Sequence, residues 1–190
     1  MARCGHSWVH LACWIDVHVT LGVTMNILAA MDAFDLSCLN DAALLVDSKL
    51  DLLDERAKRS LDPDADGIYD RAEYLAGFGL VACQAYLTES ISMSNRARDE
   101  ALNLGPRHAC GHSIAILVNA VANYWKHVPE WTQPLSRRAQ ATADLIGSLG
   151  VNVDSTYVVV NALYELVSPG QPRVRHVIPL LSQWRQALHK

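Results

Sequence analysis

Apolar residues recur every three or four positions along most of this chain, and this period restricts the possible folds more than any other feature. The clearest run is Leu39, Ala43, Val46, Leu50, Leu53, Ala57 and Leu61. Such spacings place side chains on one face of an α-helix, whereas a strand needs alternation at every second residue. No alternating run is long enough for a sheet. We therefore predict an all-α, single-domain bundle of six or seven helices.

The remaining helices are predicted from the same period together with start and stop signals. They cover residues 69–91, 94–105, 106–127, 134–150, 154–170 and 174–190. Ser37 or Asn40 is expected to cap the first helix. Asp154 is expected to cap the helix at residues 154–170. Gly150 is a favoured stop, and Pro179 is expected to kink or split the last helix. The small residues of 69–91 suit the close approach of another helix.

Composition and charge exclude several classes of protein. Of the 190 residues, 51% are hydrophobic and 19% are charged, which is typical of neither a disordered nor a membrane protein. The net charge of -4 gives no overall attraction to nucleic acid, so a polyanion would need a local basic patch. The candidate patch comprises Arg96, Arg98, Arg107, Lys126, Arg137 and Arg138.

The cysteines are odd in number, spread along the chain and never arranged as CxxC. They are Cys4, Cys13, Cys38, Cys83 and Cys110. This pattern is typical of neither a disulfide framework nor a zinc site built from cysteine. We expect a reducing, cytoplasmic environment.

The N-terminal segment, residues 1–31, is poorly patterned, and we place the helical domain in residues 32–190. The segment is apolar, but His10, Asp16 and His18 interrupt it, so we do not expect a membrane anchor. A translation start at Met25 or Met31 would explain why residues 1–24 differ from the rest.

The acidic loop at residues 62–73 matches the spelling of an EF-hand calcium loop. The matching positions are Asp62, Asp64, Asp66, Gly67, Asp70 and Glu73. Position eight of the loop is Tyr69 instead of an aliphatic residue, and no second loop exists to pair with it. We favour a solvated turn in which Asp66 or Asp70 caps the next helix. Calcium binding is the alternative.

A polar stripe crosses the helix predicted for residues 106–127. Pro106 suits a first helical position, which places Arg107 in the first turn. The stripe comprises His108, His112, Asn119, Asn123, Lys126 and His127. These residues could pair with a neighbouring helix or bind a ligand. His108 and His112 have the spacing of two metal ligands, but no third ligand shares their face, so we favour no metal.

Phosphate chemistry is the second functional interpretation of this helix. A helix N-terminus attracts anions, and the Arg107 guanidinium could grip a phosphate with two N–H groups. His112 could exchange a proton with a ribose 2′-hydroxyl or a leaving oxygen. This is the outline of a metal-independent ribonuclease.

The hexapeptide RHACGH, residues 107–112, resembles the Arg, polar residue, His motif of HEPN ribonucleases, all-α proteins of toxin–antitoxin and antiviral systems. The resemblance implies a homodimer in which two subunits form one RNA-cleaving cleft without a cofactor. Arg107 would bind phosphate, His112 would be the acid–base residue, and His108 would support it. An antitoxin-type protein would be a further partner.

Two other functions stay open at this stage. The first is a non-catalytic dimerisation or interaction module, whose interface would combine the polar stripe with Trp125 and Trp131. The second is a calcium-binding module that uses the acidic loop.

Overall fold

The computed structural model describes the backbone of residues 20–190 and the side chains of residues 36–190. Within residues 20–190 it contains seven α-helices and no strand, so the all-α prediction is confirmed. The helices are α1 (Thr20–Ala57), α2 (Ile68–Ser92), α3 (Arg98–Leu102), α4 (Ile114–His127), α5 (Arg137–Ser148), α6 (Val158–Val167) and α7 (Ile178–Leu188). A 3-10 turn, η1 (Val128–Glu130), directly follows α4. A second one, η2 (Val174–His176), precedes α7.

The chain divides into two units, Met1–Phe34 and Asp35–Lys190, and the second unit is the helical bundle considered below. Side chains of the poorly patterned segment 1–31 lie outside the described part, and so do residues 1–19 altogether. The prediction about residues 1–24 therefore stays a prediction. No helix in the described residues has the length and apolar character needed to cross a membrane.

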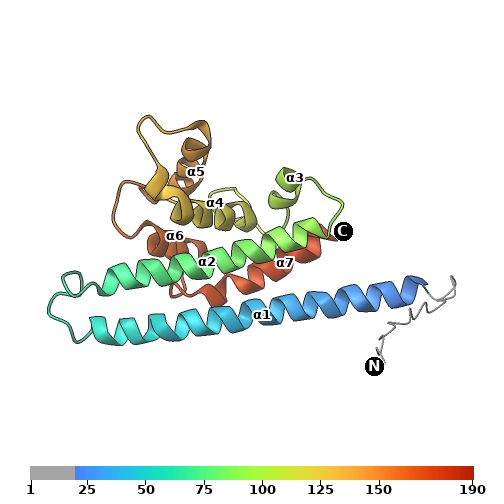
Figure 1. Ribbon diagram of the computed structural model, residues 1–190, viewed down its shortest axis with the longest axis horizontal. Coiled ribbons are helices and arrows are strands. Elements are labelled where there is room, and N and C mark those ends of the chain that lie inside the picture. The colour runs from blue at the N-terminus through green and yellow to red at the C-terminus, as the bar shows by residue number, and fades with distance from the viewer. Residues whose placement is uncertain (1–19) are drawn as a thin grey trace, which may run out of the picture. The chain divides into compact units, whose positions relative to one another are not determined.

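Helix α2 runs through the middle of the bundle and packs against α4, α6 and α7 (Figure 1). Two glycines make this approach possible. A Cβ at Gly77 would lie 2.2 Å from ring atoms of Trp125 on α4, and one at Gly79 would lie 2.4 Å from Val174. The prediction that small residues on this helix admit a close neighbour is confirmed.

Helix α1 contributes the predicted apolar stripe, and Leu39, Val46 and Leu50 are buried in the core. The predicted ends are wrong. Ser37 and Asn40 do not cap the helix, because α1 already begins at Thr20. Leu61 lies beyond the helix end at Ala57 and is fully exposed.

An acidic row on α1 holds the turn η2 in place. Asp47 is fully buried and accepts hydrogen bonds from the backbone N–H groups of Val174 (2.8 Å) and Arg175 (3.0 Å). The side chain of Arg173 bonds to Asp51 (2.8 Å) and also to Asp54. These bonds satisfy N–H groups at the start of η2 that have no partner within the turn itself.

Helices α5 to α7 agree with the prediction in type but differ at their ends. Ser136 caps α5 by accepting from the Ala139 N–H at 3.2 Å, so α5 begins after Pro134. The residue before α6 is Tyr157, in a left-handed conformation (φ 58°), and not the predicted cap Asp154. The helix predicted for residues 174–190 is divided into η2 and α7 just before Pro179, so the prediction that it is split there is confirmed. Pro179 lies in the first turn of α7, where a missing N–H costs no bond.

Candidate functional site: the 107–113 hairpin and a polar groove

Residues 106–113 form a tight hairpin, which corrects the predicted helix start at Pro106. The His108 N–H donates to the His112 carbonyl (2.9 Å), and Arg107 pairs with Ser113 in an isolated antiparallel bridge. The turn itself is closed by Gly111 N–H to the His108 carbonyl (2.9 Å). Gly111 has φ 91°, a conformation that favours glycine and interrupts a helix. Helix α4 begins only at Ile114.

Ser113 determines where α4 begins. Its hydroxyl oxygen accepts from the Ile116 N–H at 3.2 Å, the bond of an N-cap. The Ile114 N–H donates to the Pro106 carbonyl at 3.0 Å. Ser113 and Ile114 are buried. The predicted placement of Arg107 in the first turn of this helix is therefore wrong.

The three motif residues have different surroundings in the hairpin. Arg107 is exposed, and its guanidinium donates to the Gly111 carbonyl at 2.7 Å. His108 Nδ1 accepts from the Cys110 N–H (3.2 Å), so Nε2 carries the proton and donates to the Glu165 carbonyl (3.2 Å). The His112 ring is part-exposed, and we find no hydrogen bond from it to the described residues.

The hairpin also changes the predicted arrangement of His108 and His112. The two residues are paired through their backbones across the hairpin, instead of lying one turn apart on a helix. Within the described residues, no group of three or more His, Cys, Asp or Glu side chains is placed to hold a metal ion.

The acidic loop shares one conformational feature with a calcium loop and departs from it elsewhere. Gly67 is left-handed (φ 63°), but α2 begins directly after it at Ile68. Both carboxylate oxygens of Glu73 accept backbone N–H groups of α6, from Val159 and Val160 at 2.8 Å each. Burial raises the pKa of Glu73, and these two hydrogen bonds oppose that rise. The last carboxylate of the calcium template therefore faces another helix.

Three other loop carboxylates accept hydrogen bonds within or near the loop. Asp62 accepts from the Ala65 N–H at 3.0 Å, and Asp66 accepts from the Ser60 hydroxyl at 2.6 Å. The Tyr157 hydroxyl donates to Asp64. The predicted caps Asp66 and Asp70 are wrong, since Gly67 precedes α2 and no side chain caps it.

A second polar cluster joins α2, α3 and α4. Gln84, almost fully buried, donates through its Nε2 to Asn119 Oδ1 (2.9 Å) and Asn123 Oδ1 (2.8 Å). Lys126 Nζ donates to Gln84 Oε1 at 2.6 Å, and Arg98 Nη2 donates to Asn119 Oδ1 at 2.9 Å. The stripe residues Asn119, Asn123 and Lys126 thus meet around Gln84.

The hydrogen bonds of this cluster determine how its amides are oriented. Lysine and arginine are donors only, so Lys126 must face Gln84 Oε1 and Arg98 must face Asn119 Oδ1. The Nε2 of Gln84 is then left to donate, and both asparagine oxygens must accept. Consequently the Nδ2 groups of Asn119 and Asn123 remain as donors, and both residues line a groove.

This polar groove has a volume of about 600 Å³ and lies between α3, α4 and α5. Arg98 and Arg138 contribute positive charge, and Asp99 and Glu130 contribute negative charge. His127 also lines it, 3.3 Å from Glu130. Part-buried Trp131 adds an aromatic surface and contacts Tyr124 edge to face, with 5.2 Å between ring centroids.

The polar groove and the hairpin are separate places on the bundle. Ser136, at the start of α5, lines the groove, whereas Ser148, at the end of α5, contacts Cys110 of the hairpin (3.7 Å). Twelve residues of helix separate these two serines by roughly 18 Å. The predicted motif and most of the predicted polar stripe therefore do not form one site.

Sequence reasoning missed Gln84 in the groove cluster, and it placed Arg98 in a basic patch without identifying its partner. Gln84 lies among small and apolar residues of α2, and a buried amide in such a run needs hydrogen-bond partners. That signal was present in the sequence. Nothing in the sequence paired Arg98 with Asn119, because they come from different helices.

Comparison with protein-family models, with curated proteins and with solved structures finds no match to this chain.

Proposed function

We propose that the protein binds single-stranded RNA in the polar groove. The observation that carries the proposal is the fixed orientation of Asn119 and Asn123, whose Nδ2 groups remain as donors in the groove. Phosphate, ribose and base edges are rich in acceptors, so they complement such a surface. Because the amides are held by Gln84, little side-chain entropy is lost when a ligand binds.

The remaining walls of the groove support the same ligand class. Arg98 and Arg138 can contact phosphate oxygens, and Trp131 offers a surface on which a base can stack. Asp99 and Glu130 limit the positive field, so binding is expected to be modest and salt-dependent. Two arginines and two carboxylates leave the groove formally neutral, in a chain whose net charge is -4.

The test uses Asn119→Asp and Asn123→Asp, which keep the oxygen that accepts from Gln84 and replace only the donor in the groove. A labelled 12-nucleotide RNA is titrated in EDTA at low salt and followed by fluorescence anisotropy. We expect each variant to weaken binding at least about tenfold, since a donor becomes a repelling carboxylate. The control is Asn161→Asp on the exposed side of α6. Wild-type affinity in both groove variants, or no binding by the wild type, would refute the proposal.

A second candidate function is RNA cleavage at the hairpin, in line with the HEPN resemblance. It is favoured by the solvent access of Arg107 and His112 within one six-residue turn. The 2′-hydroxyl would attack the adjacent phosphorus and pass its proton to His112, while the bond to the 5′-oxygen breaks. His112 would then return the proton to that oxygen, leaving a 2′,3′-cyclic phosphate. Arg107 would stabilise charge on the phosphate, and His108 would brace the turn.

Cleavage is tested separately from binding. Wild-type protein is incubated with RNA in EDTA, and the products are analysed for 2′,3′-cyclic phosphate ends. Activity should fall at least about a hundredfold in Arg107→Ala and in His112→Ala. His189→Ala, near the exposed C-terminus, is the control. Equal activity in all four proteins would remove this candidate and leave groove binding untouched. A homodimer, implied by the same resemblance, is checked by sedimentation.

A further inference from the structure

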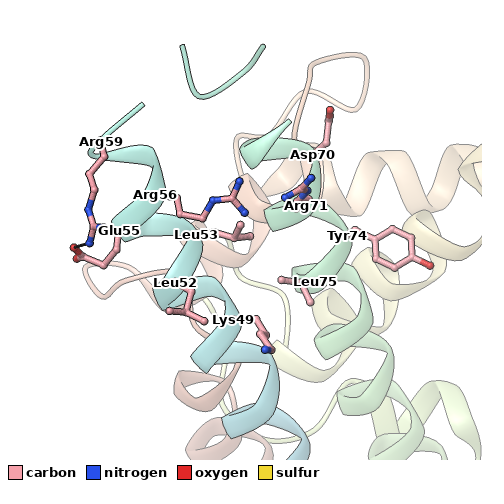
Figure 2. A pocket seen from close by; sticks show the side chains of 10 residues that line it. All are labelled: Lys49, Leu52, Leu53, Glu55, Arg56, Arg59, Asp70, Arg71, Tyr74 and Leu75. Atoms are coloured by element: carbon pink, nitrogen blue, oxygen red, sulfur yellow. Dashed lines mark ion pairs between the residues drawn. The ribbon is translucent and has the colours of Figure 1, made fainter. Parts of the chain in front are cut away.

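A second groove lies between the C-terminal half of α1 and the N-terminal half of α2, away from the residues used above. It has a volume of about 810 Å³, and its apolar floor includes Leu52, Leu53 and Leu75. Figure 2 shows Lys49 and Arg56 extending from α1 toward α2, with Arg71 and Leu75 on the facing side. We refer to it as the apolar groove.

Exposed apolar side chains continue from this groove along both helices. Leu45 and Leu52 are seven residues apart on the same face of α1 and are 63% and 57% exposed. Tyr74 and Phe78, one turn apart on α2, are 65% and 54% exposed. Among the described residues, these four are half of the eight large hydrophobic side chains that lie open to solvent. A clustered apolar surface of this kind is typical of a binding site.

Unpaired positive charge surrounds the apolar groove. Lys49, Arg56 and Arg71 line it, and none of them makes an ion pair or a hydrogen bond with another described side chain. The nearby carboxylate of Glu55 is bonded to Lys58 (2.7 Å), and this bond lowers the pKa of Glu55. Asp70 is the other carboxylate of the groove. The groove therefore has four cations, counting Arg59, against two carboxylates in a chain of net charge -4.

We propose that the apolar groove binds an amphipathic helix of a partner protein whose apolar face is flanked by Asp and Glu. A groove between two antiparallel helices accepts a third helix, with apolar anchors at successive turns. The face from Leu45 to the end of α1 at Ala57 is about 18 Å long, which matches about three helical turns. Flanking carboxylates would pair with Lys49, Arg56 and Arg71 and fix the orientation of the helix.

Charge distinguishes this occupant from two others. A second copy of the chain, related by two-fold symmetry, would place the same cations on both sides of the interface. The chain's own residues 1–19 contain one carboxylate, Asp16, and one basic side chain, Arg3, so they lack the complementary charge.

The experiment selects ligands from a displayed library of helices of about 16 residues, presented to the full chain. Every member has a leucine stripe, and the flanking positions vary among Asp, Glu, Lys, Arg and Ser. We expect enrichment of Asp and Glu at those flanks. The affinity of an enriched peptide, measured by fluorescence anisotropy, should fall at least about tenfold in Arg56→Glu/Arg71→Glu. Arg137→Glu/Lys190→Glu carries the same charge change on exposed positions elsewhere and should bind as the wild type.

Four outcomes would overturn the proposal. Flanks that select no carboxylates would remove the charge argument, and affinity unchanged in Arg56→Glu/Arg71→Glu would put the peptide elsewhere. A dimer that dissociates only in that variant would assign the groove to a second copy. Binding of oleate with the same residue dependence, without any enriched peptide, would assign it to a small amphiphile. Melting temperatures of both double variants check that the fold is kept.

Discussion

The polar groove and the apolar groove both depend on helix α2 but are built in opposite ways. In the polar groove, Gln84 from α2 organises two asparagines, so the polar atoms are oriented before any ligand arrives. In the apolar groove, Tyr74 and Leu75 from the same helix lie near Lys49, Arg56 and Arg71, which make no ion pair with a side chain in the described part of the chain. One surface is preorganised by hydrogen bonds, whereas the other leaves apolar area and charge for a partner to cover.

This difference predicts different recognition in the two places. Oriented donors discriminate among ligands by where their acceptors lie, and a misplaced acceptor leaves a polar group unpaired. An apolar floor with flexible basic side chains discriminates mainly by shape and charge, and it tolerates variation in sequence. A substitution that alters one groove therefore leaves the other as an internal reference.

The largest effect is expected from Asp47→Ala, which should damage the apolar groove selectively. Asp47 is buried and accepts two backbone N–H groups of η2, so its loss leaves both unsatisfied. We expect the free energy of unfolding to fall by about 3 kcal/mol. Because the bonds tie α1 to η2, peptide affinity should fall while RNA affinity is kept.

Chemical denaturation and the two binding assays measure these effects. The matched control is Asp41→Ala, an exposed aspartate on the same helix, which should change stability by less than about 0.5 kcal/mol. Equal losses in the two variants would mean that Asp47 does not hold α1.

A smaller loss is expected from Gly77→Ala, at the contact between α2 and α4. The added methyl group would lie 2.2 Å from the Trp125 ring, so the ring must move, at a cost of about 2 kcal/mol. Trp125 contacts Tyr74 edge to face (5.3 Å between centroids), and Tyr74 lines the apolar groove. Peptide binding should therefore weaken more than RNA binding.

The control for that change is Gly147→Ala, in helix α5. No atom lies within 4 Å of the position of its added Cβ, so the substitution should stabilise the protein by roughly 0.5 kcal/mol. Thermal melts of both variants provide the comparison. A destabilised Gly147→Ala, or an unaffected Gly77→Ala, would contradict the packing at these helices.

The smallest effect concerns pH and the contact between α2 and α6. Burial raises the pKa of Glu73 in the folded protein above its ordinary value near 4.3. The folded state then binds a proton more tightly than the unfolded state, so this contribution to stability is full at low pH and is lost as pH rises through the folded pKa. Glu73→Gln cannot titrate and should lack this component.

The measurement is the difference in unfolding free energy between wild type and Glu73→Gln at several pH values. We expect wild type to lose stability relative to the variant as pH rises from about 4. A difference that grows in the opposite direction would mean that the hydrogen bonds from Val159 and Val160 outweigh burial.

The fold class and most helices could be predicted from the sequence because they rest on local periodicity. The prediction for residues 106–113 was wrong because Pro106 and Ser113 are both valid helix-start signals. Gly111, which adopts φ 91°, makes the later start the better one. The gathering of Asn119 and Asn123 on one face followed from helical phase, but their partner Gln84 is 35 residues away from Asn119 in the chain.

The sequence by itself determined that this chain is helical, which faces of its helices are apolar, and that α4 has a polar side. Those properties depend on residues within a few turns of one another. Only the tertiary structure decided that Glu73 binds α6, that Asn119 and Asn123 keep their donors for a groove, and that cations on α1 and α2 surround one apolar surface. These features join residues far apart in the chain, and such pairings depend on how whole helices pack.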